Sequence, residues 1–373
     1  MFILHKLPAC AENTYRMEEI MLNLNDRNWT AFFINDLFIV KRPKPRSEKQ
    51  YQSGNVPFVA SGNFNNGVIK CCAPNFDESL EKGNCITISP VDGSAFYQES
   101  DFLGRGGAGS SILLLYCDKI NRYSGLFITK MISQTCKKYC YGKMGNQQNI
   151  KREKIMLPTD KYGYPDYDFM EKYIKERERQ LIKKYTDFIC NTPQIVEAMP
   201  PLESLEWDEF FLTDLFTEIK RGKRLKKEHH INGNMPYISS SALSNGVDNF
   251  IANKDNVRIF SDCLTLANSG SVGSCFYHPY HFVASDHVTS LYNPKFNRYH
   301  YLFLSTIICR VSEKYNFNRE INDMRISKEK ILLPIDKNGL PDYDYMEQYG
   351  KYIMLKKYQQ YLDYKNTDPE RTQ

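Results

Sequence analysis

The chain has 373 residues, of which 42% are hydrophobic, and it carries a formal net charge of +5. This length suffices for two domains with separate cores, and the apolar and aromatic content excludes a disordered chain. The charge leans basic but falls short of the balance that by itself indicates nucleic-acid binding, so the placement of the basic residues has to decide.

The cysteines argue against a secreted protein that is held together by disulfides. There are 11 of them, an odd number, and they show no regular Cys-x-x-Cys spacing. Neither Cys71 with Cys72 nor Cys136 with Cys140 has a second pair of ligands at zinc spacing, so no metal site is predicted. The apolar run at residues 1–4 is too short for a signal sequence or a membrane span. We therefore expect reduced thiols, a cytoplasmic location and no membrane contact.

The sequence contains an internal repeat of about 178 residues, as the spacing of Trp29 and Trp207 shows. Trp29 recurs as Trp207, and the Asp-Leu-Phe at 36–38 recurs at 214–216. The closing segment KIMLPTDKYGYPDYDFMEKY, which begins at Lys154, returns as KILLPIDKNGLPDYDYMEQY from Lys330. A repeat of this extent indicates two copies of one domain.

Within the first copy, the predicted elements in chain order are strands at 56–61, 95–97 and 112–116 and a helix near 125–133. Short strands mixed with a helix and separated by Gly, Asn and Pro predict an α+β fold, and each copy then ends in a long helical pattern. The predicted organisation is an N-terminal arm (1–28), a first domain (29–164), a central helix (165–192), a second domain (193–340), a C-terminal helix (341–365) and a tail (366–373).

The two long helices have marked beginnings and apolar stripes. The spacing Asp-x-x-Glu at Asp168 and again at Asp344 predicts a capping box at each helix start. The apolar residues at helical spacing are Met170, Ile174, Leu181, Tyr185 and Phe188 in the first helix and Met346, Tyr349, Ile353 and Tyr361 in the second. Such stripes need a partner, and we expect the helices to pair as an antiparallel coiled coil. The alternative is that each stripe packs only against its own domain.

No catalytic centre is predicted. Methylation of amino groups on DNA bases requires an Asn/Asp/Ser-Pro-Pro-aromatic loop, and the most similar segment, at 293–296, has Lys295 in place of the second Pro. The Gly-rich segment at 104–111 lacks the Lys of a phosphate-binding loop. No Glu-x-Lys follows Asp166 or Asp342 at the distance a metal-dependent nuclease needs. The histidines of the second copy have no nucleophile beside them that recurs in the first.

A basic cluster follows Asp-Leu-Phe in both copies. Its members are Lys41, Arg42, Lys44 and Arg46 in the first copy and Lys220, Arg221, Lys223, Arg224, Lys226 and Lys227 in the second. A solvated run of charges is the ordinary interpretation, but the same placement in two diverged copies favours contact with phosphates on two DNA segments.

The stretches in which the copies differ are candidates for base recognition, because a duplicated DNA-binding domain keeps its frame and varies the loops that contact bases. They are 102–111 against 282–290 and 139–152 against 315–328. Arg suits the guanine edge, and Asn or Gln the adenine edge. The candidates are Arg105, Lys143, Asn146, Gln147, Gln148, Arg152, Asn268, Ser269, His287, Asn318, Arg319, Asn322 and Arg325. An ordinary surface or turn role is the alternative for each.

This arrangement resembles the specificity (S, or HsdS) subunits of type I restriction-modification systems and the related specificity subunits of BcgI-type (type IIB) systems. The resemblance covers nearly the whole chain from Trp29. It rests on the paired Asp-Leu-Phe segments, on MPYIS at 235–239, LANSGSVG at 266–273 and FVASDH at 282–287, and on the two Pro-Asp-Tyr-Asp helix starts. The first copy departs from the pattern, with GRGGAG at 104–109 where the second has ASDHV at 284–288.

The resemblance implies two target-recognition domains, each recognising one half of a bipartite, gapped site in double-stranded DNA. The helices would set the gap and bind methyltransferase subunits for adenine methylation, with or without a restriction subunit. S-adenosylmethionine and, where a nuclease acts, Mg²⁺ would belong to those partners, because the chain itself binds no cofactor and is not an enzyme. A helix of about 22 residues spans about 33 Å, close to one turn of B-DNA. The alternative is a non-catalytic interaction or phage-defence scaffold that is derived from such a subunit.

Overall fold

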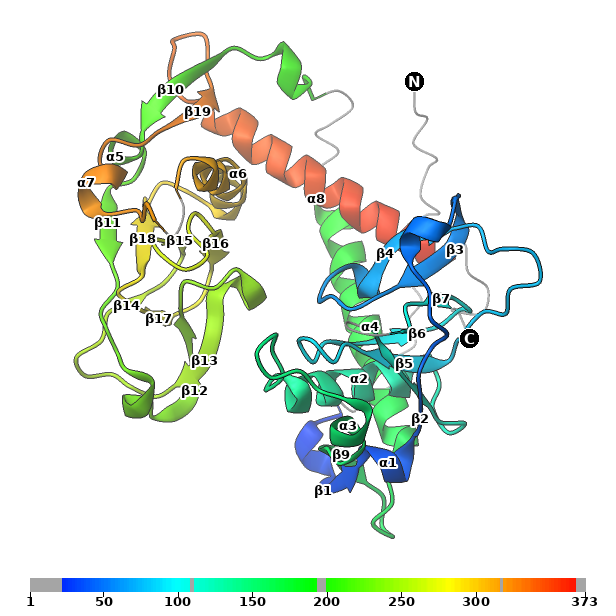
Figure 1. Ribbon diagram of the computed structural model, residues 1–373. Helices are drawn as coiled ribbons and strands as arrows, with labels where there is room; N and C mark the ends of the chain where they lie inside the picture. Colours follow the sequence, from blue (N-terminus) through cyan, green and yellow to red (C-terminus); the bar gives the residue numbers. More distant parts are fainter. Residues whose placement is uncertain (1–21, 108–110, 193–198, 316–317, 367–373) are drawn as a thin grey trace. The chain divides into compact units, whose positions relative to one another are not determined.

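The computed structural model describes residues 22–107, 111–192, 199–315 and 318–366. The chain divides into two compact units, Met1–Lys183 and Lys184–Gln373, which are described one at a time below. In each unit one main helix packs against a small sheet, and the chain then leads into a long terminal helix (Figure 1). The predicted α+β duplication is confirmed.

The first unit contains a two-stranded ribbon and two small sheets. The ribbon is β1-β9, and the sheets have the strand orders β2-β8-β5-β6 and β4-β3-β7. The elements are β1 (Asn28–Phe33), α1 (Ile34–Leu37), β2 (Ile39–Lys41), β3 (Ser53–Val59), β4 (Val68–Cys72), β5 (Cys85–Ile88), β6 (Ala95–Gln98), β7 (Leu103–Gly104), β8 (Leu113–Tyr116), α2 (Arg122–Cys136), α3 (Gln147–Lys151), β9 (Lys154–Thr159) and α4 (Tyr167–Asn191).

The second unit repeats this plan. Its ribbon is β10-β19, and its sheets have the orders β11-β18-β15-β16 and β13-β12-β17-β14. The elements are β10 (Trp207–Phe211), α5 (Leu212–Leu215), β11 (Glu218–Arg221), β12 (Asn232–Ile238), β13 (Val247–Ile251), β14 (Ile259–Phe260), β15 (Cys263–Ala267), β16 (Cys275–His278), β17 (Phe282–Ala284), β18 (Val288–Tyr292), α6 (Arg298–Ile308), α7 (Asp323–Ile326), β19 (Lys330–Pro334) and α8 (Tyr343–Asn366).

The central strands are apolar on both faces because both faces are covered. In the first unit Leu113 and Leu115 of β8 pack with Ile128 of α2, whereas Ile112 and Leu114 pack among side chains of the other sheet. Successive side chains of a strand point to opposite faces, so a strand between a helix and a second sheet needs apolar residues throughout. This burial explains the uninterrupted hydrophobic run at 112–115.

In each domain the two-stranded ribbon lies where the chain enters and leaves the domain. In β1-β9 the register runs from Asn28 opposite Thr159 to Phe33 opposite Lys154. In β10-β19 Phe211 lies opposite Lys330 in the same way. The first and last strands of each domain are therefore paired with each other.

The long helices begin where predicted, but the capping residue is a different aspartate. Asp166 Oδ1 accepts a hydrogen bond from the Phe169 amide at 2.9 Å, and Asp342 Oδ1 accepts one from Tyr345 at 2.9 Å. The predicted caps at Asp168 and Asp344 are wrong, since both residues lie inside the first helical turn. The first aspartate of each Pro-Asp-Tyr-Asp directly precedes the first helical residue, which is the position of an N-cap.

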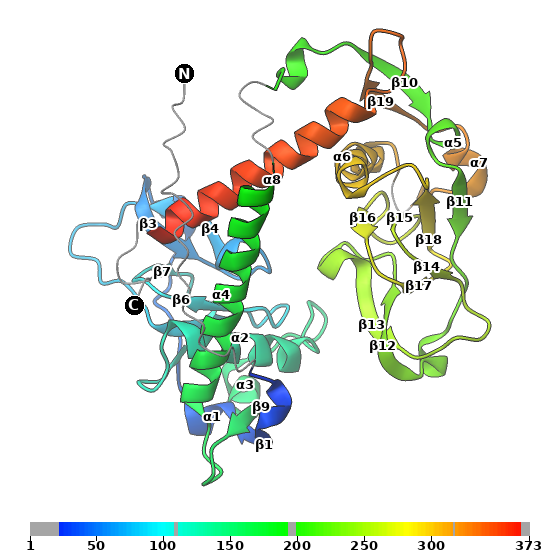
Figure 2. The same cartoon turned by 180° about the vertical axis from the view of Figure 1, so that it is seen from behind.

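The apolar stripes divide their contacts between the domains and the other helix. Met170 is buried in the core of the first domain and Met346 in that of the second. Figure 2 shows α8 running past α6 in its own domain. Further along, the Tyr185 ring of α4 stacks on Tyr358 of α8 with centroids 4.0 Å apart, and Phe188 meets Tyr358 edge-on at 5.2 Å. The first turns of each helix thus follow the own-domain alternative, and an extended coiled coil stays a prediction.

The predicted N-terminal arm lies mostly outside the described residues, as do residues 193–198 and nearly all of the predicted tail. Of the arm, residues 22–28 are described, and the Leu24 carbonyl accepts a hydrogen bond from the indole of Trp29 at 2.8 Å. Among the helices of the described ranges, none is long and apolar enough to span a bilayer.

Candidate nucleic-acid interface

The two basic clusters occupy equivalent positions on equivalent strands. Lys41 of β2 lies opposite Leu114 of β8, and Lys220 of β11 lies opposite Ser290 of β18. Counting from these lysines gives the pattern Lys-Arg-x-Lys in both domains, at 41–44 and at 220–223. Both lysines of each pattern are exposed. The repeated charge therefore begins at the end of an edge strand of the main sheet and continues into the segment that follows it.

Arg46 differs from the rest of its cluster because it is buried. Its guanidinium donates to Glu78 Oε1 at 2.8 Å, to Glu81 Oε1 at 2.6 Å and to the Ser79 carbonyl at 2.7 Å. Only 2% of the side chain is exposed. Burial would raise the pKa of Glu78, but the hydrogen bonds from Arg46 and Tyr51 outweigh it and hold that pKa below its usual value. The predicted phosphate contact at Arg46 is replaced by a structural ion pair.

The strands at which the basic clusters begin, β2 and β11, contact the variable stretches at 139–152 and 315–328. The side chains that make this contact differ between the two domains. In the first domain the Gln147 amide donates to the Val40 carbonyl at 3.0 Å. In the second, Arg221 Nε lies 3.3 Å from Asp323 Oδ1, and its Nη2 donates to the Ile321 carbonyl at 3.3 Å. Gln147 and Arg221, both predicted to contact DNA, therefore also join the strand to a loop.

The loops that follow β5 and β15 contact the same variable stretches at 139–152 and 315–328. Gly145 donates to the Pro90 carbonyl at 2.7 Å in the first domain, and Ile321 donates to the Asn268 carbonyl at 3.0 Å in the second. The Asn268 amide in turn donates to the His287 carbonyl at 2.8 Å. Stretches that are far apart in the sequence thus form one continuous surface in each domain.

Two of the candidates on this surface have buried side chains. Asn268 is only 2% exposed, and its amide group pairs with the Thr289 hydroxyl at 2.9 Å. Ser269 is also buried, and its Oγ lies 2.7 Å from His287 Nδ1. Asn268 is therefore unavailable for a base, whereas His287 is exposed and uses its Nδ1 for this contact.

Several predicted base contacts have local roles. Asn146 caps α3 by accepting from the Asn149 amide at 2.9 Å, and Asn322 caps α7 by accepting from the Arg325 amide at 2.9 Å. The Arg325 guanidinium donates to the Glu320 carbonyl. All three side chains support the loops, and the Oδ1 atoms of Asn146 and Asn322 already accept a hydrogen bond.

The remaining candidates lie on the surface. Arg105 Nη1 lies 3.7 Å from Glu48, and the Arg319 guanidinium lies over the Tyr315 ring at 5.3 Å. Lys44 donates to Ser79 Oγ at 2.5 Å, and Lys223 donates to Asn256. The other exposed members are Arg42, Lys143, Gln148, Arg152, Arg224, Lys226, Lys227 and Asn318.

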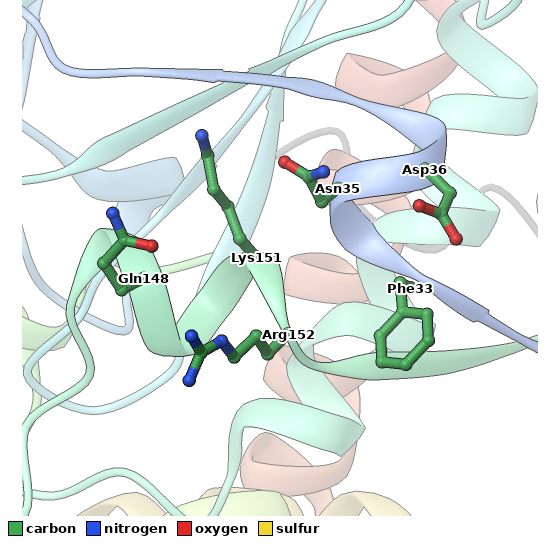
Figure 3. Close-up of a pocket in the computed structure, with 6 residues that line it drawn as sticks. All are labelled: Phe33, Asn35, Asp36, Gln148, Lys151 and Arg152. Carbon is green, nitrogen blue, oxygen red and sulfur yellow. The ribbon is translucent and has the colours of Figure 1, made fainter.

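An open hollow of about 390 Å³ lies between α1 and α3 of the first domain (Figure 3). It is lined by Phe33, Asn35, Asp36, Gln148, Lys151 and Arg152. Figure 3 shows Lys151 between the amides of Gln148 and Asn35. Two cations and two amides against the single carboxylate of Asp36 leave the hollow with a net positive lining, which suits a phosphate or a base edge. Asn35 and Lys151 were not predicted from the sequence, although each lies beside a segment that was.

A buried carboxylate holds the second variable stretch in both domains. Glu153 accepts from Lys138 Nζ at 2.6 Å and from the Tyr139 hydroxyl. Glu329 accepts from Lys314 at 2.6 Å and from Tyr315 at 2.8 Å. This network was not predicted from the sequence either. Its signal was the Lys-Tyr pair that precedes a Glu at the same distance in both copies.

Comparison with known proteins places the chain in a family. The model of the type I restriction modification DNA specificity domain matches residues 26–185 and again residues 204–362. The chain belongs to this family. It is a specificity subunit of a restriction-modification system with two target-recognition domains, as the sequence resemblance predicted.

Similar proteins span nearly the same length. The type II restriction enzyme specificity subunit S.BcgI of Heyndrickxia coagulans is 31% identical over 327 residues, which are 86% of this chain and 93% of that protein. The S subunit of a type I system from M. genitalium is 17% identical, with a TM-score of 0.39 over 92% of this chain and 94% of that one. The HsdS subunit from Thermoanaerobacter tengcongensis is 11% identical, with a TM-score of 0.32 over 90% of each chain.

Proposed function

We propose that each domain recognises one half of a bipartite, gapped DNA site through the surface described above. The observation that supports this most is the contrast between the constant and the variable parts of that surface. Both domains carry Lys-Arg-x-Lys from the same position of the equivalent strands β2 and β11. By contrast, Gln147 of the first domain is equivalent in position to Asp323 of the second, and the two residues differ in chemistry. Constant cations suit phosphates, and variable polar groups suit different bases.

The chain would act without chemistry of its own. Within the described ranges, no group of three or more His, Cys, Asp or Glu side chains is arranged to hold a metal ion. We propose that methyltransferase subunits bind along the long helices and carry out adenine methylation with S-adenosylmethionine, in the cytoplasm. A restriction subunit that uses Mg²⁺ would join them where the system also cleaves DNA.

The test is to co-express the chain with the methyltransferase subunit of its system and to map methylated adenines across the genome. The expected result is a two-part motif with a fixed gap. Gln148→Ala should change only the half recognised by the first domain, and His287→Ala only the other half. Lys161→Ala, an exposed loop position in the first domain, is the control.

A continuous motif, or none, would contradict the proposal. Methyl transfer or cleavage by the purified chain alone would overturn the non-catalytic assignment. If the chain with its partner failed to retard any duplex in a gel-shift experiment, the scaffold alternative would replace DNA recognition.

A further inference from the structure

A cluster of polar side chains joins the main helix of each domain to the long helix that follows. It consists of an Asn at the start of α2 or α6, a Tyr in the next turn, and a Glu and a Lys on α4 or α8. We refer to it as the Asn–Glu–Lys cluster. Its members are Asn121, Tyr123, Glu171 and Lys175 in the first domain and Asn297, Tyr299, Glu347 and Lys351 in the second.

In the first domain the Asn side chain bonds in two directions. Asn121 Oδ1 accepts from the amides of Tyr123 and Ser124 at 3.0 Å each, and so caps α2. Its Nδ2 donates to Glu171 Oε2 at 2.5 Å. The other Glu171 oxygen lies 2.7 Å from Lys175 Nζ, which lies over the Tyr123 ring at 4.9 Å. The bond to Lys175 contributes most to lowering the pKa of Glu171, so the carboxylate is charged at neutral pH.

The second domain repeats these contacts. Asn297 caps α6 and donates to Glu347 Oε2 at 2.8 Å, and Glu347 Oε1 lies 2.5 Å from Lys351. His300 takes the place of Ser124, whose Oγ accepts from the Asn121 backbone amide at 3.0 Å, because His300 Nδ1 accepts from the Asn297 backbone amide at 3.0 Å. With Nδ1 accepting, the proton is on Nε2, which donates to the carbonyl of Tyr343 at 3.1 Å. Tyr343 is the first residue of α8, so this contact holds the helix start as well.

The cluster contributes more to the orientation of the long helix than to the free energy of folding. Ion pairs at partly exposed positions add little to the free energy of folding, and Asn121 is exposed. The buried Met170 and Met346 already attach the helices to their domains. An apolar contact is non-directional, whereas two directed contacts cross between the helices here, the bond from the Asn amide to the carboxylate and the Lys ammonium over the Tyr ring. Together they fix the rotation and tilt of the long helix.

Small changes of tilt become large at the far end of such a helix. The 25 residues of α4 span about 37 Å at about 1.5 Å per residue. A tilt of about 5° displaces the far end by about 3 Å, which is close to the 3.4 Å rise of one base pair. We propose that the Asn–Glu–Lys cluster fixes the gap between the two half-sites by setting the direction in which each long helix leaves its domain. Glu171 and Glu347 are then positioning residues, and this proposal rests on the proposed function.

The experiment uses the complex with its methyltransferase subunit and a series of duplexes that carry both half-sites at the wild-type gap and at gaps one base pair shorter and longer. The wild-type complex should prefer its own gap by about tenfold or more in affinity. Glu171→Ala and Glu347→Ala should reduce this preference to about twofold while binding to each isolated half-site is kept. The same variants should methylate genomic sites with neighbouring gaps.

Matched variants separate positioning from stability. Glu171→Gln and Glu347→Gln keep an acceptor for the Asn amide and should keep most of the gap preference. Lys161→Ala and Lys337→Ala change equivalent exposed loop positions ahead of the same helices and should have no effect. If an alanine variant fails to fold, Lys175→Met and Lys351→Met test the same point with the helix caps intact.

A uniform loss of affinity at all gaps, with the preference unchanged, would show that the cluster is only structural and would overturn the inference. Failure of the proposed function gives a different result, because the wild-type complex would then show no gapped motif at all.

Discussion

The Nε2 of His278 lies 2.9 Å from the Thr265 hydroxyl, deep in the core of the second domain. In the first domain the equivalent strands carry Gln98 and Thr87, and the Gln98 amide donates to that hydroxyl at 3.1 Å. An imidazole and an amide thus fill the same buried position. The difference between them is that the imidazole titrates.

Burial lowers the pKa of His278 from 6.5 to about 4. His278 is therefore protonated below about pH 6.5 in the unfolded chain but only below about pH 4 in the folded chain. The stability of the second domain should be complete above that range and fall as the pH drops through it, by up to about 1.4 kcal/mol per pH unit. His278→Gln, which reproduces the first domain, should remove this slope in denaturant titrations from pH 7 to 4. His281→Gln, at an exposed position, is the control, and an unchanged slope in His278→Gln would contradict the assignment.

Arg46→Ala should destabilise the first domain by about 3 kcal/mol, because it removes a buried guanidinium and leaves two partly buried carboxylates without their cation. Lys44→Ala, two residues earlier and exposed, should stay within about 0.5 kcal/mol. Thermal unfolding of both variants measures the difference. At a temperature where Arg46→Ala is folded, its DNA affinity should equal that of the wild type, and a marked loss there would restore a direct role in DNA binding.

Lys41→Ala and Lys220→Ala should each weaken DNA binding on every sequence, and each should reduce the slope of log affinity against log salt by about 1. The reason is that each exposed ammonium on an edge strand releases about one counterion when it meets a phosphate. Lys161→Ala should leave the slope unchanged. If either variant altered the methylated motif and kept the salt slope, that lysine would contact a base instead.

The stacked pair Tyr185 and Tyr358 should be coupled energetically. A double-mutant cycle with Tyr185→Ala and Tyr358→Ala is expected to give about 1 kcal/mol of coupling in unfolding free energy. A parallel cycle that pairs Tyr358→Ala with Tyr162→Ala, an exposed tyrosine in a loop of the first domain, should be additive. Additivity in both cycles would show that the contact between α4 and α8 contributes nothing.

The sequence predicted those features that local pattern or repetition controls. The helix near 125–133 is part of α2, and the strand at 95–97 is part of β6, because both are set by apolar periodicity within a few residues. The cap was placed two residues late because only the second aspartate of Pro-Asp-Tyr-Asp has a Glu three residues after it, as a capping box does. Those Glu side chains instead bond to the Asn at the start of α2 or α6, a partner about 50 residues away.

The candidate site was harder to predict because partners distant in the chain decide it. Arg46 looks like its neighbours in the sequence, but its carboxylate partners come from more than 30 residues away. Asn268 likewise resembles a base-contacting residue until Thr289 is seen beside it. What the repeat did supply is the equivalence of Lys41 and Lys220, since strand register and sequence register agree there.

The ribbons at the base of each domain have a consequence for how such chains change over time. Because Asn28 is paired with Thr159, the chain enters and leaves the first domain at adjacent points. Everything between them could be exchanged for another domain that begins and ends in the same ribbon, without altering the helix that follows. Each recognition domain is therefore built as an exchangeable cassette, and a genetic crossover in the two similar closing segments would produce a new pairing of half-sites in one step.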